Sequence, residues 1–227
     1  MKNYFSYILI SLFLLSAGKI SRAQDCTYYF PKKTGTEIVM KSYSEKDKLT
    51  SVGKSKVVEV SGNAVKIESE VFDDKEKSLG KSNFTVTCEN GEFVMDLSNY
   101  LKGVNMDAYK DMEVKIETEA MHMPATLKAG DALDDGQMTI VVSNQGFKMM
   151  TMKVRIFNRK VEKLESMTTP AGTFDCAKIT YDVDSKVVVS TTGKGVEWIS
   201  KNVGVVRSES YNSKGKMVGY TLLASIK

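Results

Sequence analysis

A single histidine in this chain of 227 residues excludes a His-rich metal site and limits histidine-based catalysis to one position. His122 stands between Met121 and Met123, and no CxxC, HExxH, Walker or GxSxG pattern accompanies it. Thioethers and imidazole together suggest copper, but neighbouring residues of an extended segment point to opposite sides, which separates His122 from the two methionines. We therefore predict no catalytic residue, no metal site and no cofactor.

Methionine is unusually frequent, with 13 in the chain. Met150 and Met152 alternate with polar residues on one predicted strand, and their flexible thioethers suit either an irregular core or a cavity for apolar ligands. Both interpretations stay open. In the second, Met150 and Met152 line the cavity, Met121 and Met123 lie over its opening, and the cavity exceeds roughly 300 Å³.

Paired acids are the remaining candidates for catalysis. They occur at residues 73–74, 134–135, and 182 with 184. Two carboxyl groups held roughly 5 to 10 Å apart could hydrolyse a glycosidic bond. These acids lie in polar turns, where carboxylates are usually solvated, so a hydrolase is the less favoured alternative.

Three cysteines allow one disulfide and leave one thiol. Cys88 alternates with Phe84 and Val86, which predicts a buried thiol. Cys176 alternates with Lys178 and Thr180, which predicts a solvent-facing side chain. We therefore expect Cys26 to pair with Cys176.

Residues 1–23 have the features of a secretory signal peptide. Lys2 precedes an apolar run over residues 7–15, and Ser21 and Ala23 offer small side chains for cleavage. The run is too short to span a bilayer. We expect one exported domain at residues 24–227, periplasmic or extracellular, with no transmembrane anchor. The acid at Asp25, directly before Cys26, argues against a lipoprotein.

Charge gives little support for a nucleic-acid partner. The predicted leader takes with it three of the 32 cations and none of the 28 acids, which leaves a mature net charge of +1. No basic run is interleaved with aromatic residues. We therefore expect no binding to nucleic acid.

Alternation of apolar and charged residues dominates the rest of the chain. Val65, Ile67 and Val71 interleave with charged residues, for example, and Gly-containing turns separate such runs. The expected strands cover residues 36–43, 54–60, 64–72, 81–88, 92–97, 112–119, 138–144, 147–158, 174–183, 185–192, 196–200, 203–211 and 216–226.

So many strands predict an all-β fold, in which a curled antiparallel sheet forms a barrel or half-barrel. A two-layer β-sandwich is the alternative. One short helix is expected at 105–112, with Asn105 as its cap. Residues 120–136 show no periodicity, which is typical of a lid or binding loop.

Three stretches, at residues 25–31, 168–176 and 196–209, resemble the TapB-like family of uncharacterised exported proteins of Gram-negative bacteria, within a larger domain-of-unknown-function group. The Pro170-Ala171-Gly172-Thr173-Phe174 turn is the most specific element. The resemblance implies an exported β-barrel-like domain and supplies no activity or catalytic residues.

The sequence thus predicts a non-catalytic exported protein that binds an apolar or amphipathic ligand, such as a small molecule or lipid, in or at the mouth of a β-barrel. The alternative is a structural or interaction module that docks an envelope protein.

Overall fold

A computed structural model describes residues 27–95, 112–186 and 189–227, and these residues form one antiparallel sheet of thirteen strands with no helix. The strands are β1 (Glu37–Ser44), β2 (Leu49–Ser61), β3 (Ala64–Asp73), β4 (Ser78–Glu89), β5 (Glu92–Met95), β6 (Glu113–Thr118), β7 (Met121–Met123), β8 (Gly136–Asn144), β9 (Phe147–Thr169), β10 (Gly172–Lys186), β11 (Ser190–Ser200), β12 (Gly204–Asn212) and β13 (Met217–Ile226). The described part of the chain contains no helix able to cross a membrane.

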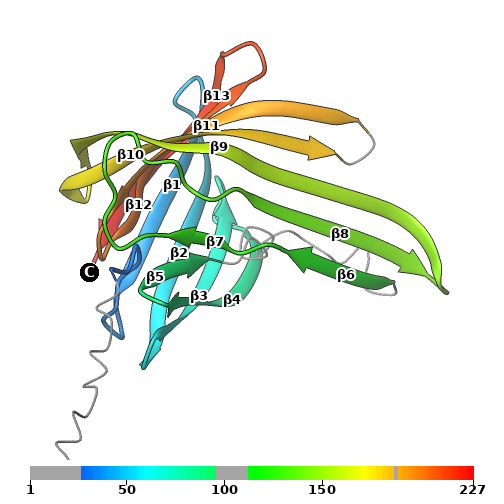
Figure 1. Cartoon of the computed structure of the whole chain (residues 1–227), viewed down its shortest axis with the longest axis horizontal. Helices are drawn as coiled ribbons and strands as arrows, with labels where there is room; N and C mark the ends of the chain where they lie inside the picture. Colours follow the sequence, from blue (N-terminus) through cyan, green and yellow to red (C-terminus); the bar gives the residue numbers. More distant parts are fainter. Residues whose placement is uncertain (1–26, 96–111, 187–188) are drawn as a thin grey trace, which may run out of the picture.

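The sheet is curled but open (Figure 1). Its strands follow the order β6-β8-β9-β10-β11-β12-β13-β1-β2-β3-β4-β5-β7, so β6 and β7 are the two edges, although only Glu119 and Ala120 separate them in the chain. No ladder joins β6 to β7 within the described ranges. The all-β antiparallel prediction is confirmed, whereas the closed barrel is wrong, and one continuous sheet replaces the alternative of two separate layers.

The curl follows from irregular strand pairing. Register shifts interrupt the ladders of β2 with β3 after Val57, and of β11 with β12 after Trp198. An extra residue on one strand bends it and increases its twist, so repeated bulges roll a long sheet up. The predicted helix lies almost wholly within residues 96–111, outside the described residues, and Met112 at its end lies in a bend.

The hairpin turns follow the predicted chemistry. Asn90 and Gly91 have φ angles of 52° and 85° between β4 and β5, and Gln145 and Gly146 have 48° and 81° between β8 and β9. A two-residue turn of this hand matches the twist of the flanking strands. At the other extreme of sequence separation, β1 pairs with β13, and the ladder closes with reciprocal backbone bonds of 3.0 Å between Glu37 and Lys227.

The main core lies between the two halves of the curled sheet. Side chains of β2 to β5 and β7 meet those of β9 to β11, and the segment before β1 fills the space between them. The buried members are Tyr28, Tyr29, Val57, Val65, Ile67, Val86, Cys88, Phe93, Met123, Leu127, Leu133, Val161, Ala177, Ile179 and Ile199. Because β3 and β10 stand six places apart in the sheet, they can share a core only if the sheet folds over itself.

Residues 120–136, predicted as a lid or binding loop, are packed into the body instead. They include β7, and Leu127 and Leu133 are buried in the main core. Backbone bonds of 2.9 Å, from Leu133 to Arg159 and from Val161 to Asp131, tie the segment to β9. The segment lacks periodicity because its apolar residues anchor separate turns rather than one face of a strand.

Candidate functional site

The predicted methionines fall into two places. Met121, Met150 and Met152 belong to one apolar cluster, which we call the methionine cluster, whereas Met123 is buried in the main core. The methionine cluster consists of buried Met121, Met138, Ile140 and Val142 with partly buried Met95, Met112, Val114, Met150, Met152, Val154 and Ile156. Sequence analysis therefore placed three of the four side chains in one neighbourhood.

The methionine cluster fills the space where the two ends of the sheet approach each other. Met95 on β5 and Met121 on β7 come from one end, and β8 and β9 supply Ile140 and Met152 from the other. Flexible thioethers adapt to such an irregular boundary, which is the first of the two interpretations. A ligand-lining role for the four predicted methionines stays a prediction.

An apolar cavity of about 240 Å³ adjoins this region, and we call it the interior hollow. Its lining residues are Tyr29, Phe30, Ile38, Met40, Ser55, Phe84, Val86, Phe93, Met95, Ile199, Val203 and Val205. None of them carries a charge. The hydroxyl of Tyr29 donates to the carbonyl of Pro124 at 3.1 Å, and that of Ser55 donates to Ser69 at 3.0 Å. The walls therefore offer apolar contact and no general acid or base.

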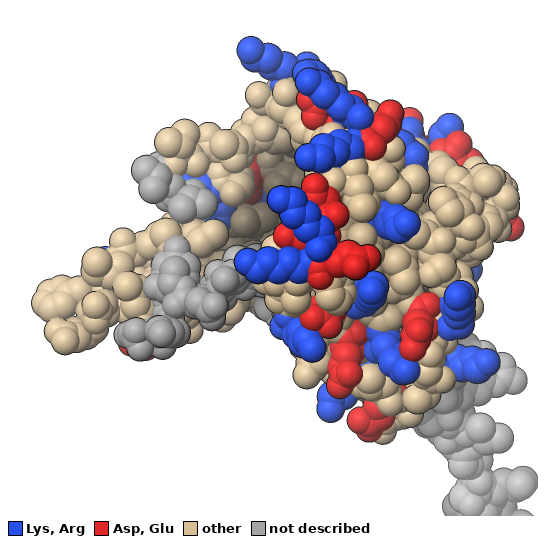
Figure 2. Space-filling model, turned by 180° about the vertical axis from the view of Figure 1, so that it is seen from behind, with Lys and Arg blue, Asp and Glu red and all other residues tan. Residues whose placement is uncertain are grey.

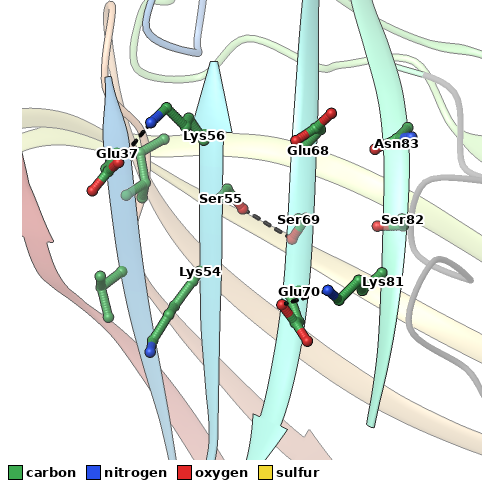
Figure 3. Close-up of a pocket in the computed structure, with 12 residues that line it drawn as sticks. Glu37, Lys54, Ser55, Lys56, Glu68, Ser69, Glu70, Lys81, Ser82 and Asn83 are labelled. Atoms are coloured by element: carbon green, nitrogen blue, oxygen red, sulfur yellow. Dashed lines mark hydrogen bonds and ion pairs between the residues drawn. The ribbon is translucent and has the colours of Figure 1, made fainter. Parts of the chain in front are cut away.

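A larger hollow of about 630 Å³ lies on the charged outer face of β1 to β4 (Figure 3). The middle residues Ile38, Ser55 and Ser69 point inward, so their backbone forms a floor between two rows of long side chains. Opposite charges in these rows pair across strands, as Lys56 does with Glu37 at 2.9 Å and Lys81 with Glu70 at 3.5 Å. Figure 2 shows the same mixture of signs over the face in view. Mutual pairing leaves this groove without a net charge to attract a ligand.

A third hollow, of about 850 Å³, lies between β9 to β11 and residues 126 and 127. Leu164, which is 58% exposed, contributes apolar surface to it. Its two acids are engaged, because Glu165 accepts a bond of 2.8 Å from the Trp198 indole and Asp175 accepts one of 2.9 Å from Ser166. The hydrogen bonds hold both carboxylates in place as structural groups.

The prediction that the acid pairs lie in turns is only partly confirmed: Asp73 ends β3 at a turn, whereas Asp182 and Asp184 lie within β10. Asp73 accepts the backbone N–H groups of Lys77 and Lys75 at 2.9 Å each, and these bonds hold the pKa of its carboxyl below the usual value. Asp135 pairs with Arg155 at 3.1 Å, and Asp182 accepts a bond of 2.8 Å from Asn158. Each of these three carboxylates accepts a hydrogen bond or ion pair from neighbouring groups, which gives it a structural role.

The predicted bridge of Cys26 with Cys176 is wrong, because Cys176 is a free and buried thiol. It packs beside Trp198 under the partly buried Met167 and Phe174, so this side of β10 is covered as well. Burial, followed by the nearby charges of Asp175 and Glu165, raises the pKa of Cys176 to about 11. Cys88, predicted as the lone buried thiol, is disulfide-bonded instead. Cys26 lies outside the described residues.

Metal-binding side chains do not assemble in the described ranges, where no three His, Cys, Asp or Glu residues come together. The Nδ1 atom of His122 lies 3.4 Å from Glu92 on the neighbouring strand. His122 is half-exposed while Met121 and Met123 are buried, as the alternation of side chains predicts.

Sequence analysis missed a polar group on the inner side of β9 to β11. The Tyr181 hydroxyl donates to Glu197 at 3.0 Å, and the guanidinium of buried Arg159 lies close enough to act on the same carboxyl while donating to the Asp134 carbonyl at 2.6 Å. Burial raises the pKa of Glu197, and the bond from Tyr181 and the charge of Arg159 oppose that rise without cancelling it. An acid directly before the lone tryptophan was the only signal in the sequence.

Replacing Glu197 by Gln is expected to change how stability depends on pH. Since the folded-state pKa of Glu197 lies above its unfolded value, its protonated form favours folding at low pH, and this contribution is lost as pH rises through the folded pKa. Glu197→Gln keeps an acceptor for Tyr181 and removes the buried charge. Urea unfolding over a pH series should show that the stability of the variant rises relative to that of the wild type as pH rises. A constant difference in stability across the series would contradict the raised pKa of Glu197.

A model of the DUF3108-like family matches residues 33–223, which is most of the chain. The chain belongs to the DUF3108-like family. The group of unknown function implied by the three motifs is thereby confirmed, while the narrower TapB-like resemblance stays a prediction. No curated protein matches the chain.

Two crystal structures of other proteins are similar to this chain over nearly its whole length. A putative lipoprotein from Parabacteroides distasonis has a TM-score of 0.76 at 31% identity, over 90% of this chain and 100% of its own. A putative exported protein with a YmcC-like fold from Bacteroides fragilis has a TM-score of 0.74 at 26% identity, over 89% and 100%. Relatives of this DUF3108-like chain are thus exported proteins or lipoproteins by description, which suggests a place in the cell envelope.

Proposed function

We propose that this DUF3108-like protein is an exported, non-catalytic binding protein that holds the apolar part of a small amphipathic ligand in the interior hollow. The observation that carries the proposal is the hollow itself, with its uncharged walls and its two engaged hydroxyls. Such walls favour contact with a hydrocarbon chain, and both of their hydroxyl groups already donate hydrogen bonds within the protein.

The size of the interior hollow limits which ligands it can hold. Its volume is about 240 Å³, so the prediction of a ligand cavity above roughly 300 Å³ is wrong for this hollow, which is too small to enclose a whole drug-sized molecule. A short acyl chain, with its polar head left in water, suits this volume. Met40 and Met95 in the walls supply adaptable contact, and Met95 also belongs to the methionine cluster. The site therefore adjoins the predicted methionines rather than consisting of them.

A filling substitution tests the proposal. Val205→Phe adds a ring to the wall of the interior hollow, and Val218→Phe adds the same ring on β13 at a half-exposed position. We expect a medium-chain fatty acid, followed by displacement of a fluorescent apolar probe, to bind the wild type and Val218→Phe. Val205→Phe should bind at least tenfold more weakly, because the apolar area that the chain would occupy is taken.

A second filling variant protects the test against misfolding. Met95→Phe acts on another strand of the same wall, and circular dichroism and melting temperature report whether each variant folds. Equal affinity of the folded filling variants and the wild type would refute the proposal, as would no binding by the wild type. The alternative, a module that docks an envelope protein, stays a prediction.

A further inference from the structure

The hairpin of β8 and β9 projects from the body of the molecule (Figure 1). Their ladder continues from the pair Gly136–Ile156 to the pair Asn144–Phe147, which makes an arm roughly 27 Å long at the usual rise per residue. Gln145 and Gly146 turn the chain at its end. The arm therefore carries its tip well away from the main core.

Large apolar side chains are exposed at this tip. Phe147 is 76% exposed and Met149 is 62% exposed. Met149 is the extra residue of a bulge in the β8–β9 ladder, because Lys148 pairs with Ser143 and Met150 pairs with Val142. An aromatic ring and a thioether so exposed at the end of a projection, where nothing in the fold requires them, suggest contact with another surface.

The charge of the arm points to the kind of surface. The arm, residues 136–156, contains no acid and three cations. Arg155 is paired with Asp135, whereas Lys148 and Lys153 form no ion pair with an acid in the described ranges. In Figure 2 the lower of the two projections at the left is the arm, and its visible described surface shows little charge, in contrast to the mixed charges of the body. An anionic surface complements these two lysines.

We propose that the β8–β9 tip docks the protein on an anionic lipid surface, with Phe147 and Met149 in the headgroup region and Lys148 and Lys153 near lipid phosphates. Aromatic and flexible apolar side chains flanked by lysine are the composition that interfacial membrane anchors use. Each lysine close to an anionic leaflet adds a favourable electrostatic contribution to the binding free energy, and salt weakens this contribution. The site is separate from the interior hollow, so neither proposal depends on the other.

The test uses the full-length protein purified from its own cells. This protein is mixed with vesicles of phosphatidylethanolamine and phosphatidylglycerol. We expect Phe147→Ser to weaken vesicle binding about tenfold. Burying a phenyl group contributes enough free energy to account for an affinity change of at least this size. Lys148→Gln should weaken it by about fivefold, and added salt should reduce that difference. Leu79→Ser, at a 43% exposed position on β4, is the matched control and should bind as the wild type does.

A local readout separates the tip from any other attachment to lipid. Phe147→Trp places a fluorophore at the tip, and the native Trp198 is buried and supplies a constant background. We expect a blue shift of emission on addition of the anionic vesicles and a smaller one with phosphatidylcholine alone. The absence of a shift, or equal binding by Phe147→Ser and Leu79→Ser, would overturn the proposal. A shift that grows with protein concentration without vesicles would assign the tip to a second copy and overturn it too.

Discussion

Reduction of the Cys88 disulfide is expected to lower the free energy of unfolding by about 2–5 kcal/mol. Cys88 lies on β4 in the main core, directly opposite Phe93 on β5. A cross-link at this point restricts the unfolded chain, and its loss releases that restriction. Urea unfolding with and without a reductant measures the effect, and Cys88→Ala should show the same loss with no further response to the reductant.

Cys176 provides the control for the disulfide experiment. Its burial and its pKa of about 11 predict that the native protein reacts very slowly with a thiol reagent at pH 8, whereas the unfolded, unreduced protein exposes one thiol. Cys176→Ala should abolish that signal and leave the response to reductant intact. Two or more reactive thiols in the unreduced, unfolded chain would contradict the disulfide at Cys88.

A side chain at Gly195 is expected to destabilise the protein by about 1–3 kcal/mol, the usual cost of overpacking a core. Gly195 is buried on β11, and a Cβ atom there would overlap the ring of Tyr181, which lies across the ladder on β10. The hydroxyl of Tyr181 is also bonded to Glu197, so the ring cannot swing aside without breaking that bond. Thermal unfolding of Gly195→Val measures the cost.

Gly53→Ala is the matched control for Gly195. A Cβ atom at Gly53 would meet the Cβ of Met40 at 3.9 Å, an ordinary contact, so this substitution should be neutral or slightly stabilising. In a Tyr181→Ala background the penalty of Gly195→Val should shrink, since the overlapping ring is gone. If the penalty persists in the double variant, the ring does not explain why position 195 needs glycine.

Local patterns predicted the strands and turns because they depend on neighbouring residues. Val65 and Ile67 are fully buried, while Lys66 between them and Glu68 after them are exposed, and Asn90-Gly91 forms the expected turn. The expected strand at residues 185–192 is wrong, since β10 continues to Lys186 and β11 covers Ser190–Ser200, and strand β9 is a second exception. It continues to Thr169, past its predicted end at residue 158, because it follows β10 through two register shifts that disturb the alternation.

Long-range features escaped prediction for a different physical reason. Whether β6 pairs with β7 decides between a closed barrel and an open sheet, and that depends on how far twelve other pairings rotate the edges. Cys176 was assigned to solvent because its neighbours Lys178 and Thr180 are polar, yet Trp198 on the adjacent strand β11 and Phe174 on its own strand belong to the same apolar cluster. The interior hollow likewise draws its walls from distant strands, and only the gathering of methionines was visible in the sequence.

The ladder between β1 and β13 has a consequence for biogenesis. In a chain translocated with its N-terminus leading, β13 crosses the membrane last. The edge of β1 that pairs with β13 therefore stays unpaired until almost the whole polypeptide has crossed. Completion of the sheet is then coupled to the arrival of Lys227 and its bonds with Glu37. Until that moment the folding intermediate has two unpaired strand edges, whose free backbone groups a chaperone would bind.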